Sequence, residues 1–420
     1  MKNNLIIDNS FVVTPLGKKG LKGPEMGSLL QIPNARIVIT DGIITYVGEK
    51  ELCPVTIGNE NYNYFDAKGN IVLPGFVDSH THLIFGGFRP DEFEWRLKGD
   101  SYMSIMQRGG GIQSTVNATK EASKTLLYNK AKWFLNRMSE MGVTTVEVKT
   151  GYGLDFTTEM KMMEIIEQLR KDEENQIDIV STFLGAHAIP NEYKGRTSEF
   201  VDILIEMLPA FKGKAKFVDV FCEKNVFEIE DSRKLLNAAK EKGFALKLHA
   251  DEIVNLGGAE LSAELKAVSA DHLLHVSEEG IRKMAEEGVV ATLLPLTAFA
   301  LKEPYAPARK FIDSGCVVAL ATDLNPGSCF SGSIPLTIAL ACIYMNMSVE
   351  ETITALTLNG AAALGLAGET GSIEVGKRGD IVILGSNNYK ILPYYIGMNC
   401  VQTTIFKGRI ISNKNFNPEI

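Results

Sequence analysis

Residues 71–82 read IVLPGFVDSHTH, an apolar run that leads into Asp78, His80 and His82. We interpret this segment as a buried strand with polar residues at its C-terminal end. Seven further segments in the middle of the chain repeat the plan of an apolar run ending in polar residues. They are residues 144–153, 177–187, 217–223, 244–252, 267–275, 289–297 and 317–328.

Amphipathic segments separate most of these strands, for example residues 157–172 and 277–288. Strand and helix alternating eight times predict an α/β fold of the TIM-like (β/α)8 barrel type, with parallel strands. A doubly wound open sheet is the alternative, and strand counting alone does not exclude it.

The two ends of the chain resemble each other and differ from the middle. Both contain short strand patterns, and the N-terminal one has a hairpin signal at Asp41-Gly42. We predict a composite β-sandwich domain formed by residues 1–70 and 371–420, with the barrel spanning residues 71–370. Residues 16–28, between two N-terminal strand patterns, read as a loop insertion.

Composition excludes several classes of protein. The 420 residues are 45% hydrophobic, which argues against intrinsic disorder, and the net charge of −8 argues against nucleic-acid binding. No run of 18 apolar residues predicts a membrane helix, and the N-terminus does not read as a signal peptide. The six cysteines contain no CxxC motif and fit free thiols in a reducing cytoplasm.

The positions of the histidines are the most informative pattern. The chain has six, and all except His275 lie at or just past the C-terminal end of a predicted strand. These five are His80, His82, His187, His249 and His272. In a (β/α)8 barrel this end of the strands is the face where active sites form.

Four of the polar strand-end residues suit a metal ion. His80 and His82 are two residues apart on a strand, so both rings point the same way. His249 and Asp323 end two other predicted strands. Three imidazoles and one carboxylate fit zinc or iron. The alternatives are surface histidines on a strand end and a helix N-cap role for Asp323.

Other polar residues near the predicted strand ends suggest proton transfer and substrate binding. Glu252 and His272 are suited to moving protons beside a metal. Arg89 and Tyr152 follow the first and second strands, although Arg89 could instead form a surface salt bridge with Asp91 or Glu92. Residues 109–111 are three glycines, which we interpret either as a mobile loop near the site or as a linker.

Together these motifs resemble the metal-dependent amidohydrolase superfamily over essentially the whole chain. Within it, the chain is similar to the imidazolonepropionase family. The segments that carry this similarity are HTHLIFGGFRPDEF, SYMSIMQRGGGIQSTV, EVKTGYGL, STFLGAHAIP, LKLHADEI, SADHL and ATDLNPGS. The terminal β segments match the accessory sandwich domain of the superfamily.

The resemblance implies hydrolytic ring opening of 4-imidazolone-5-propanoate to N-formimidoyl-L-glutamate in histidine degradation. It implies one zinc or iron ion per subunit, a cytoplasmic location, a homodimer and a small-molecule substrate as the partner. The implied metal ligands are His80, His82, His249 and Asp323. The implied substrate contacts are Arg89, Tyr102, Tyr152, His187, Glu252, Asn325, Gly327 and Ser328.

The chemistry that follows is attack of a metal-activated water on the ring carbonyl. We expect Asp323 to be a ligand and a proton acceptor, His272 to stabilise the oxyanion or orient the water, and Glu252 to hold a ring nitrogen and carry a proton. Which of these three is the primary base stays open at this point.

Three alternatives remain. A binuclear cyclic amidohydrolase would carry a carboxylated lysine at the end of the fourth strand, where Lys224 lies two residues past Cys222. A deaminase acting on a heterocycle would use similar residues. A catalytically inactive scaffold would typically have lost metal ligands, and all four positions are filled here.

Overall fold

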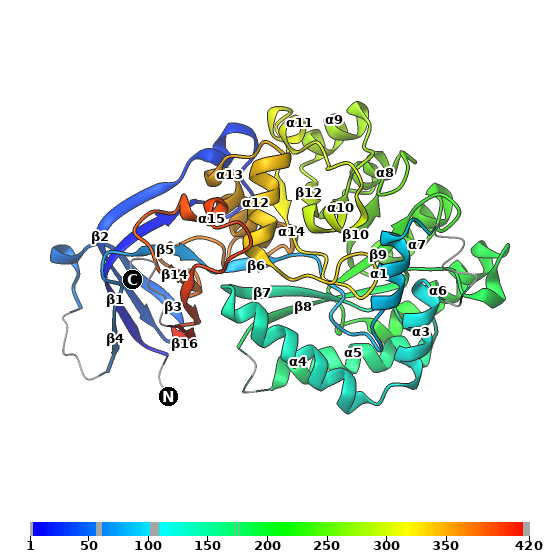
Figure 1. Cartoon of the computed structure of the whole chain (residues 1–420), viewed down its shortest axis with the longest axis horizontal. Coiled ribbons are helices and arrows are strands. Elements are labelled where there is room, and N and C mark those ends of the chain that lie inside the picture. The colour runs from blue at the N-terminus through cyan, green and yellow to red at the C-terminus, as the bar shows by residue number, and fades with distance from the viewer. Residues whose placement is uncertain are drawn as a thin grey trace.

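A computed structural model describes residues 3–55, 61–100, 108, 110–172, 174 and 176–414. The chain forms a barrel with a β domain at one side, and the first and last described strands both lie in that domain (Figure 1). Among the described residues, no helix combines the length and the apolarity that crossing a bilayer requires.

Eight parallel strands form the barrel in the order of the sequence. They are β6 Phe76–Asp78, β7 Val143–Lys149, β8 Asp178–Ala186, β9 Phe217–Cys222, β10 Ala245–Ala250, β11 Ser269–His272, β12 Val290–Leu293 and β13 Val318–Leu320. The predicted TIM-like barrel is confirmed, and the doubly wound alternative is wrong because neighbouring strands follow chain order throughout.

Helices surround this barrel (Figure 1). They are α1 Pro90–Leu97, α3 Ile112–Glu121, α4 Lys124–Glu140, α5 Phe156–Lys171, α6 Thr197–Phe211, α7 Ile229–Glu241, α8 Gly258–Leu265, α9 Glu278–Glu287, α10 Pro295–Leu301, α11 Ala308–Asp313, α12 Ile334–Tyr344, α13 Val349–Leu356 and α14 Leu358–Ala363. The main apolar core includes Val146, Phe183 and Phe211.

The barrel closes where its first and last strands meet. Thr81 and Leu324 form a parallel bridge just past the ends of β6 and β13. The His82 amide donates to the Leu324 carbonyl at 2.9 Å, and the Asp323 amide donates to the His80 carbonyl at 3.0 Å. Closure therefore brings these candidate metal ligands together from opposite ends of the barrel sequence.

The second sheet forms the small β-sandwich domain from both termini. Its order is β16-β15-β14-β5-β1-β2-β3, with β4 paired to β1. The strands are β1 Leu5–Thr14, β2 Leu30–Thr40, β3 Ile43–Glu49, β4 Asn63–Asp66, β5 Ile71–Pro74, β14 Ile381–Leu384, β15 Val401–Phe406 and β16 Arg409–Asn413. Its apolar core combines both ends of the chain, for example Ile7, Ile37, Ile383 and Ile405.

Local signals within the sequence are confirmed. Asp41 and Gly42 form a two-residue turn with φ values of 51° and 83° between β2 and β3, as expected for a tight hairpin. Ser348 and Glu351, three residues apart as the capping pattern requires, form a capping box at the start of α13. Residues 23–27 of the expected loop insertion form a short 3₁₀ helix, η1 Gly23–Gly27, that packs against α11 and α13.

The expectation of one continuous strand over residues 71–82 is wrong. The segment divides at Gly75 into β5, which pairs with β14 in the sandwich domain, and β6, which belongs to the barrel. A Cβ atom at Gly75 would lie 2.2 Å from Thr144 Oγ1, so the chain crosses between the sheets at a close contact. The predicted division at residues 70/71 and 370/371 stays a prediction.

Candidate active site

Three histidines and one aspartate meet where the barrel closes. His80 and His82 follow β6, His249 lies in β10 and Asp323 follows β13. One ring nitrogen from each histidine lies within 4.8 Å of those of the other two. Asp323 Oδ1 lies 3.6 Å from His80 Nε2 and 3.5 Å from His82 Nε2. The structure thus brings together all four residues predicted as metal ligands.

The polar atoms at the centre of this cluster fit a bound cation. His80 Nε2, His249 Nε2 and Asp323 Oδ1 are buried and have no hydrogen-bond partner within the described part of the chain. Burial without a partner is costly for such atoms, and a metal ion would satisfy them. Burial also lowers the pKa of His80 and of His82 well below the usual range, which keeps these rings in the neutral form that binds metals. The residues therefore fit zinc or iron.

Asp323 is held with one oxygen directed at the histidines. The Thr297 hydroxyl donates to its Oδ2 atom at 2.6 Å, which leaves Oδ1 facing His80 and His82. Its backbone adopts a left-handed φ of 53°, a conformation that a non-glycine residue rarely keeps without support. Burial raises the pKa of Asp323 to about 6. A neighbouring cation would stabilise its ionised form.

A cavity of about 650 Å³ opens beside this cluster. It is lined by the remaining described residues of the predicted site, namely Arg89, Tyr152, His187, Glu252, His272, Asn325, Gly327 and Ser328. Tyr102 lies outside the described residues, as does Gly109. Gly111 lines the cavity next to the start of α3. Three predicted ligands, His82, His249 and Asp323, thus share one hollow with the described substrate contacts at the C-terminal face of the barrel.

The position of the Arg89 guanidinium requires a residue without a side chain at position 327. A Cβ atom at residue 327 would lie 1.7 Å from Arg89 Nη2. The Arg89 Nε atom is buried without a hydrogen-bond partner among the described residues, and the side chain lines the cavity. Its ion pair with Glu92 is long, at 3.5 Å, and Glu92 itself lines the cavity. The surface salt bridge considered from the sequence is therefore present but weak, and it lies at the cavity wall.

The loop that contains Gly327 is organised by Asn325. The Asn325 Oδ1 atom accepts hydrogen bonds from the amides of Gly327 and Ser328, each at 2.8 Å. The Asn325 Nδ2 group donates to the Asp323 carbonyl at 2.8 Å. The Asn325 side chain thus connects the backbone of Asp323, a predicted metal ligand, to the backbone of Gly327, which lies against the Arg89 guanidinium.

Tyr152 and His187 form the wall on the other side of the cluster. Their ring centroids are 5.2 Å apart, and His187 stacks on His82 at 4.9 Å. His187 Nδ1 lies 3.1 Å from the Gly151 carbonyl. Because a carbonyl only accepts, Nδ1 carries the proton and Nε2 is left as an acceptor. Burial lowers the pKa of His187 to about 3, so the ring is neutral.

The loop after β7 that carries Tyr152 is fixed by a buried carboxylate. Glu159 accepts hydrogen bonds from the amides of Gly151, Gly153 and Leu154 at 3.1, 2.7 and 3.1 Å. These bonds hold both the Tyr152 backbone and the Gly151 carbonyl that orients His187. Glu159 lies near the start of α5 and was not predicted from the sequence.

Glu252 and His272 approach the cluster from the strands β10 and β11. His272 Nδ1 lies 3.6 Å from Glu252 Oε1, and the His272 ring lies 5.3 Å from His80 and 5.1 Å from His249 between centroids. Burial, with Asp323 nearby, raises the pKa of Glu252 to about 8. His272 has a left-handed φ of 78°, and such strain is often found at functional sites. Both residues line the cavity beside the histidine cluster.

Arg96, Phe221 and Thr297 were also not predicted from the sequence. Arg96 lines the cavity, and its Nη2 group donates to the Gly327 carbonyl at 3.1 Å. The spacing of Arg89, Glu92 and Arg96 is i, i+3 and i+7, the signal that could have placed Arg96 on the same helix face. Phe221 and Thr297 follow no charge pattern that would have singled them out.

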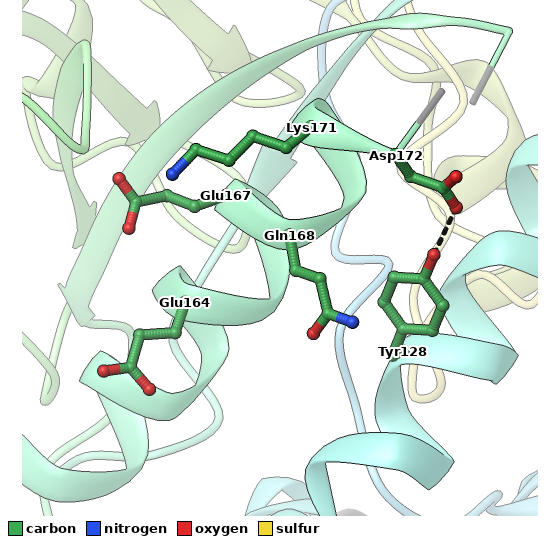
Figure 2. A pocket seen from close by; sticks show the side chains of 6 residues that line it. All are labelled: Tyr128, Glu164, Glu167, Gln168, Lys171 and Asp172. Atoms are coloured by element: carbon green, nitrogen blue, oxygen red, sulfur yellow. Dashed lines mark hydrogen bonds between the residues drawn. The ribbon is translucent and has the colours of Figure 1, made fainter. Parts of the chain in front are cut away.

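A second hollow on the outside of the barrel lies between α4 and α5 (Figure 2). Its lining residues are Tyr128, Glu164, Glu167, Gln168, Lys171 and Asp172. The Tyr128 hydroxyl donates to the Asp172 carboxylate, which Lys132 also approaches at 2.8 Å. This hollow contains none of the candidate site residues, and its three carboxylates, Glu164, Glu167 and Asp172, are each already paired with a lysine.

Comparisons with known proteins place this site in a family. The model of the amidohydrolase family matches residues 71–411. An imidazolonepropionase from Phocaeicola vulgatus is 64% identical and covers 98% of this chain and 99% of the relative. One from Clostridium tetani is 54% identical and covers 99% of this chain and 100% of the relative.

Solved structures share the fold at low identity. A 5-methylcytosine deaminase from Klebsiella pneumoniae has a TM-score of 0.74 at 16% identity and covers 98% of this chain and 99% of that one. An adenosine deaminase from Xanthomonas campestris with bound zinc has a TM-score of 0.72 at 17% identity and covers 99% and 95%. From the family match and the close relatives, the chain belongs to the amidohydrolase family and, within it, to the imidazolonepropionases.

Proposed function

We propose that this chain hydrolyses 4-imidazolone-5-propanoate to N-formimidoyl-L-glutamate, a step of histidine degradation, with one zinc or iron ion per subunit. The observation that carries the proposal is that His82, His249 and Asp323 of the ligand cluster line the same cavity as Arg89, with His80 directly behind them. The substrate combines a cyclic amide with a carboxylate. The proposed metal site would act on the amide, and Arg89 would bind the carboxylate. The activity named for the close relatives supports the same substrate.

Binding and orientation follow from the cavity wall. The planar guanidinium of Arg89 can hold the propionate carboxylate through two parallel hydrogen bonds. Tyr152 and the free Nε2 acceptor of His187 lie beside His82, where they can position the ring. The propionate arm thus places the ring carbonyl at the histidine cluster.

Proton transfers follow from three acidic or basic groups. Water adds to the ring carbonyl carbon, the adjacent ring C–N bond breaks, and the leaving nitrogen takes up a proton. Asp323 is the acceptor nearest the cluster, Glu252 carries the proton to the nitrogen, and neutral His272 stabilises charge on the carbonyl oxygen. Zinc or iron bound by the four ligands would supply Lewis-acid activation of water near neutral pH.

A single metal ion is favoured because neither of the two lysines considered, Lys224 and Lys149, is suited to serve as a bridging carboxylated lysine. Lys224 lies past the end of β9 and is exposed, so it does not occupy the position of a bridging carboxylated lysine. Lys149 is buried near the cluster, where burial alone would lower its pKa, but Asp219 and Glu147 raise that pKa above its ordinary value. A charged, ion-paired lysine is not available for carboxylation.

We also propose a cytoplasmic homodimer. All six cysteines are free thiols, which fits a reducing compartment. An exposed apolar surface covers α10, α12 and the region of the short helix α15 Ile391–Tyr394, and it is suited to a second copy of the chain. Its exposed side chains are Phe299, Ile343, Tyr344, Tyr394, Ile396 and Met398. Light scattering on purified protein would test the dimer.

The direct test is loss of the ultraviolet absorbance of imidazolonepropionate with purified protein, together with elemental analysis. The proposal requires both turnover and metal. Release of ammonia from a purine or pyrimidine without turnover of imidazolonepropionate would favour a deaminase. Absence of metal and of turnover would favour a scaffold.

Elemental analysis should find about one zinc or iron ion per chain, because three imidazoles and one carboxylate define a single site. His249→Ala should remove most of the metal. His275→Ala is a matched control, since His275 lies at the same cavity but outside the ligand cluster and should leave the metal content unchanged. Two ions per chain, or added mass on a lysine, would contradict the mononuclear site.

Gly327→Ala should lower kcat/KM for imidazolonepropionate by about 100-fold, the size of effect produced by a misplaced binding group. The added methyl would occupy the seat of the Arg89 guanidinium. Metal content should not change. Gly332→Ala is the control, because a Cβ there would make ordinary contacts, the nearest at 3.5 Å. Equal kcat/KM values for the two variants would show that substrate turnover does not depend on this position of the Arg89 guanidinium.

A further inference from the structure

A layer of five charged side chains lies inside the barrel beneath the histidine cluster. Glu147 and Lys149 come from β7, Asp219 from β9, Lys247 from β10 and Asp271 from β11, and each is fully buried. The interior of such a barrel is ordinarily filled by branched apolar residues. Buried charges are costly unless they are paired, so this layer requires an explanation beyond packing.

Two lysines and three carboxylates pair within the layer. Lys149 Nζ lies 2.7 Å from Asp219 Oδ2 and 2.9 Å from Glu147 Oε2. Lys247 Nζ lies 3.5 Å from Asp271 Oδ2 and 3.7 Å from Glu147 Oε2. With three carboxylates against two ammonium groups, the layer has one excess negative charge.

Two of the carboxylates also contact candidate metal ligands from behind. Asp271 Oδ2 lies 2.6 Å from His80 Nδ1, and Asp219 Oδ2 lies 3.0 Å from His249 Nδ1. In His80 the opposite nitrogen, Nε2, is left without a hydrogen-bond partner in the described structure. In His249 the Nε2 atom likewise has no partner there, and Nδ1 meets Asp219 as an ion-pair contact rather than a hydrogen bond. A carboxylate behind Nδ1 fixes the ring orientation and leaves Nε2 with its lone pair free for a metal.

The two contacts are themselves fixed by the layer. The Ser269 hydroxyl donates to Asp271 Oδ1 at 2.7 Å, which turns Oδ2 towards His80. Lys149 binds the same Asp219 oxygen that approaches His249. Lys149 Nζ also lies 3.7 Å from Asp271 Oδ2, so it is connected to the histidine cluster through both carboxylates, more closely through Asp219.

We propose that Asp219, Asp271 and Lys149 are positioning residues that set the metal affinity of the histidine cluster. Asp219 and Asp271 orient His249 and His80 and place a negative charge behind them, while Lys149 limits how much of that charge acts on the metal. This inference rests on the proposed metal site. It assigns opposite effects on metal affinity to the two members of one buried ion pair.

The opposite signs distinguish this role from a purely structural one. Asp219→Asn removes negative charge near the cluster and should weaken metal binding. Lys149→Met leaves the carboxylates in place and should strengthen it. If the layer only held the barrel together, breaking the same ion pair from either side would disturb the site in the same direction.

The experiment is titration of metal-free protein with zinc alone, in competition with a chelating dye, with folding checked by circular dichroism. Asp219→Asn and Asp271→Asn should each lower zinc affinity by about 10- to 100-fold, as is usual when the partner of a ligand is removed. Lys149→Met should bind zinc more tightly than the unaltered protein.

Asp8→Asn is the matched control. Asp8 is a fully buried carboxylate between two cations, Arg36 at 3.0 Å and Lys50 at 3.1 Å, but it lies in the sandwich domain. It should lower stability without changing zinc affinity. If Lys149→Met does not fold, the double variant Glu147→Gln with Lys149→Met removes one charge of each sign and should bind zinc as the unaltered protein does.

The inference is overturned if Asp219→Asn and Asp271→Asn bind zinc as Asp8→Asn does. It is also overturned if Lys149→Met weakens binding, or if the folded double variant binds zinc more weakly than the unaltered protein. Failure of the unaltered protein to bind zinc or iron would instead reject the proposed function, so the two failures are distinguishable.

Discussion

Glu252→Gln should lower turnover of imidazolonepropionate by about two to four orders of magnitude, the usual size of a general acid–base effect. The substitution keeps the shape of the side chain but removes its ability to carry a proton. Burial raises the pKa of Glu252 to about 8, so the carboxyl can both release and accept a proton near neutral pH. Steady-state kinetics with elemental analysis should show a lower kcat with unchanged metal content.

Glu303→Gln provides the comparison for this result. Glu303 is an exposed carboxylate that lines the same cavity. Its substitution by glutamine removes one negative charge, as Glu252→Gln does, but at a residue outside the proposed proton path. It should leave kcat nearly unchanged. If Glu252→Gln and Glu303→Gln behave alike, Glu252 acts only through its charge and not as a proton carrier.

Much of the fold could be predicted because its signals are local. Each barrel strand is an apolar run that ends in polar residues, and the order of strands in a barrel follows the chain. The division of residues 71–82 could not be predicted, because it depends on β14, which lies some three hundred residues along the chain and pairs with β5. Periodicity carries no information on such distant pairing.

The site was predictable where residue type and strand position coincide. His80, His249 and Asp323 all lie at strand ends, so the expectation that they converge needed only the barrel. Arg96 and Glu159 were missed because they lie on helices and reach the site through backbone contacts with Gly327 and with the loop after β7. Those contacts exist only once the chain is folded.

The sequence contains a signal for the buried charged layer from which no prediction was made. Glu147 and Lys149 alternate with valines in the fully buried strand β7, and Lys247 precedes His249 by two residues in β10. Residues two apart on a strand share a face, so these charges had to point to the same side as the site. A charge at a core position of a strand conflicts with the local pattern, and such conflicts often mark functional regions.

Arg89→Met should cost about 2 to 5 kcal/mol of substrate binding or transition-state stabilisation, as for truncation of one member of a buried charge pair. The protein has a net charge of −8, so an anionic substrate needs a local cation, and the guanidinium faces the cavity with its Nε donor unpaired among the described residues. Kinetics on imidazolonepropionate and on an imidazolone without the side-chain carboxylate should show the loss for the first substrate alone. Arg89→Lys should recover little, because an ammonium group cannot form two parallel hydrogen bonds. Metal content and the melting temperature should match those of the unaltered protein. Equal losses for both substrates, or none for either, would show that another group holds the carboxylate.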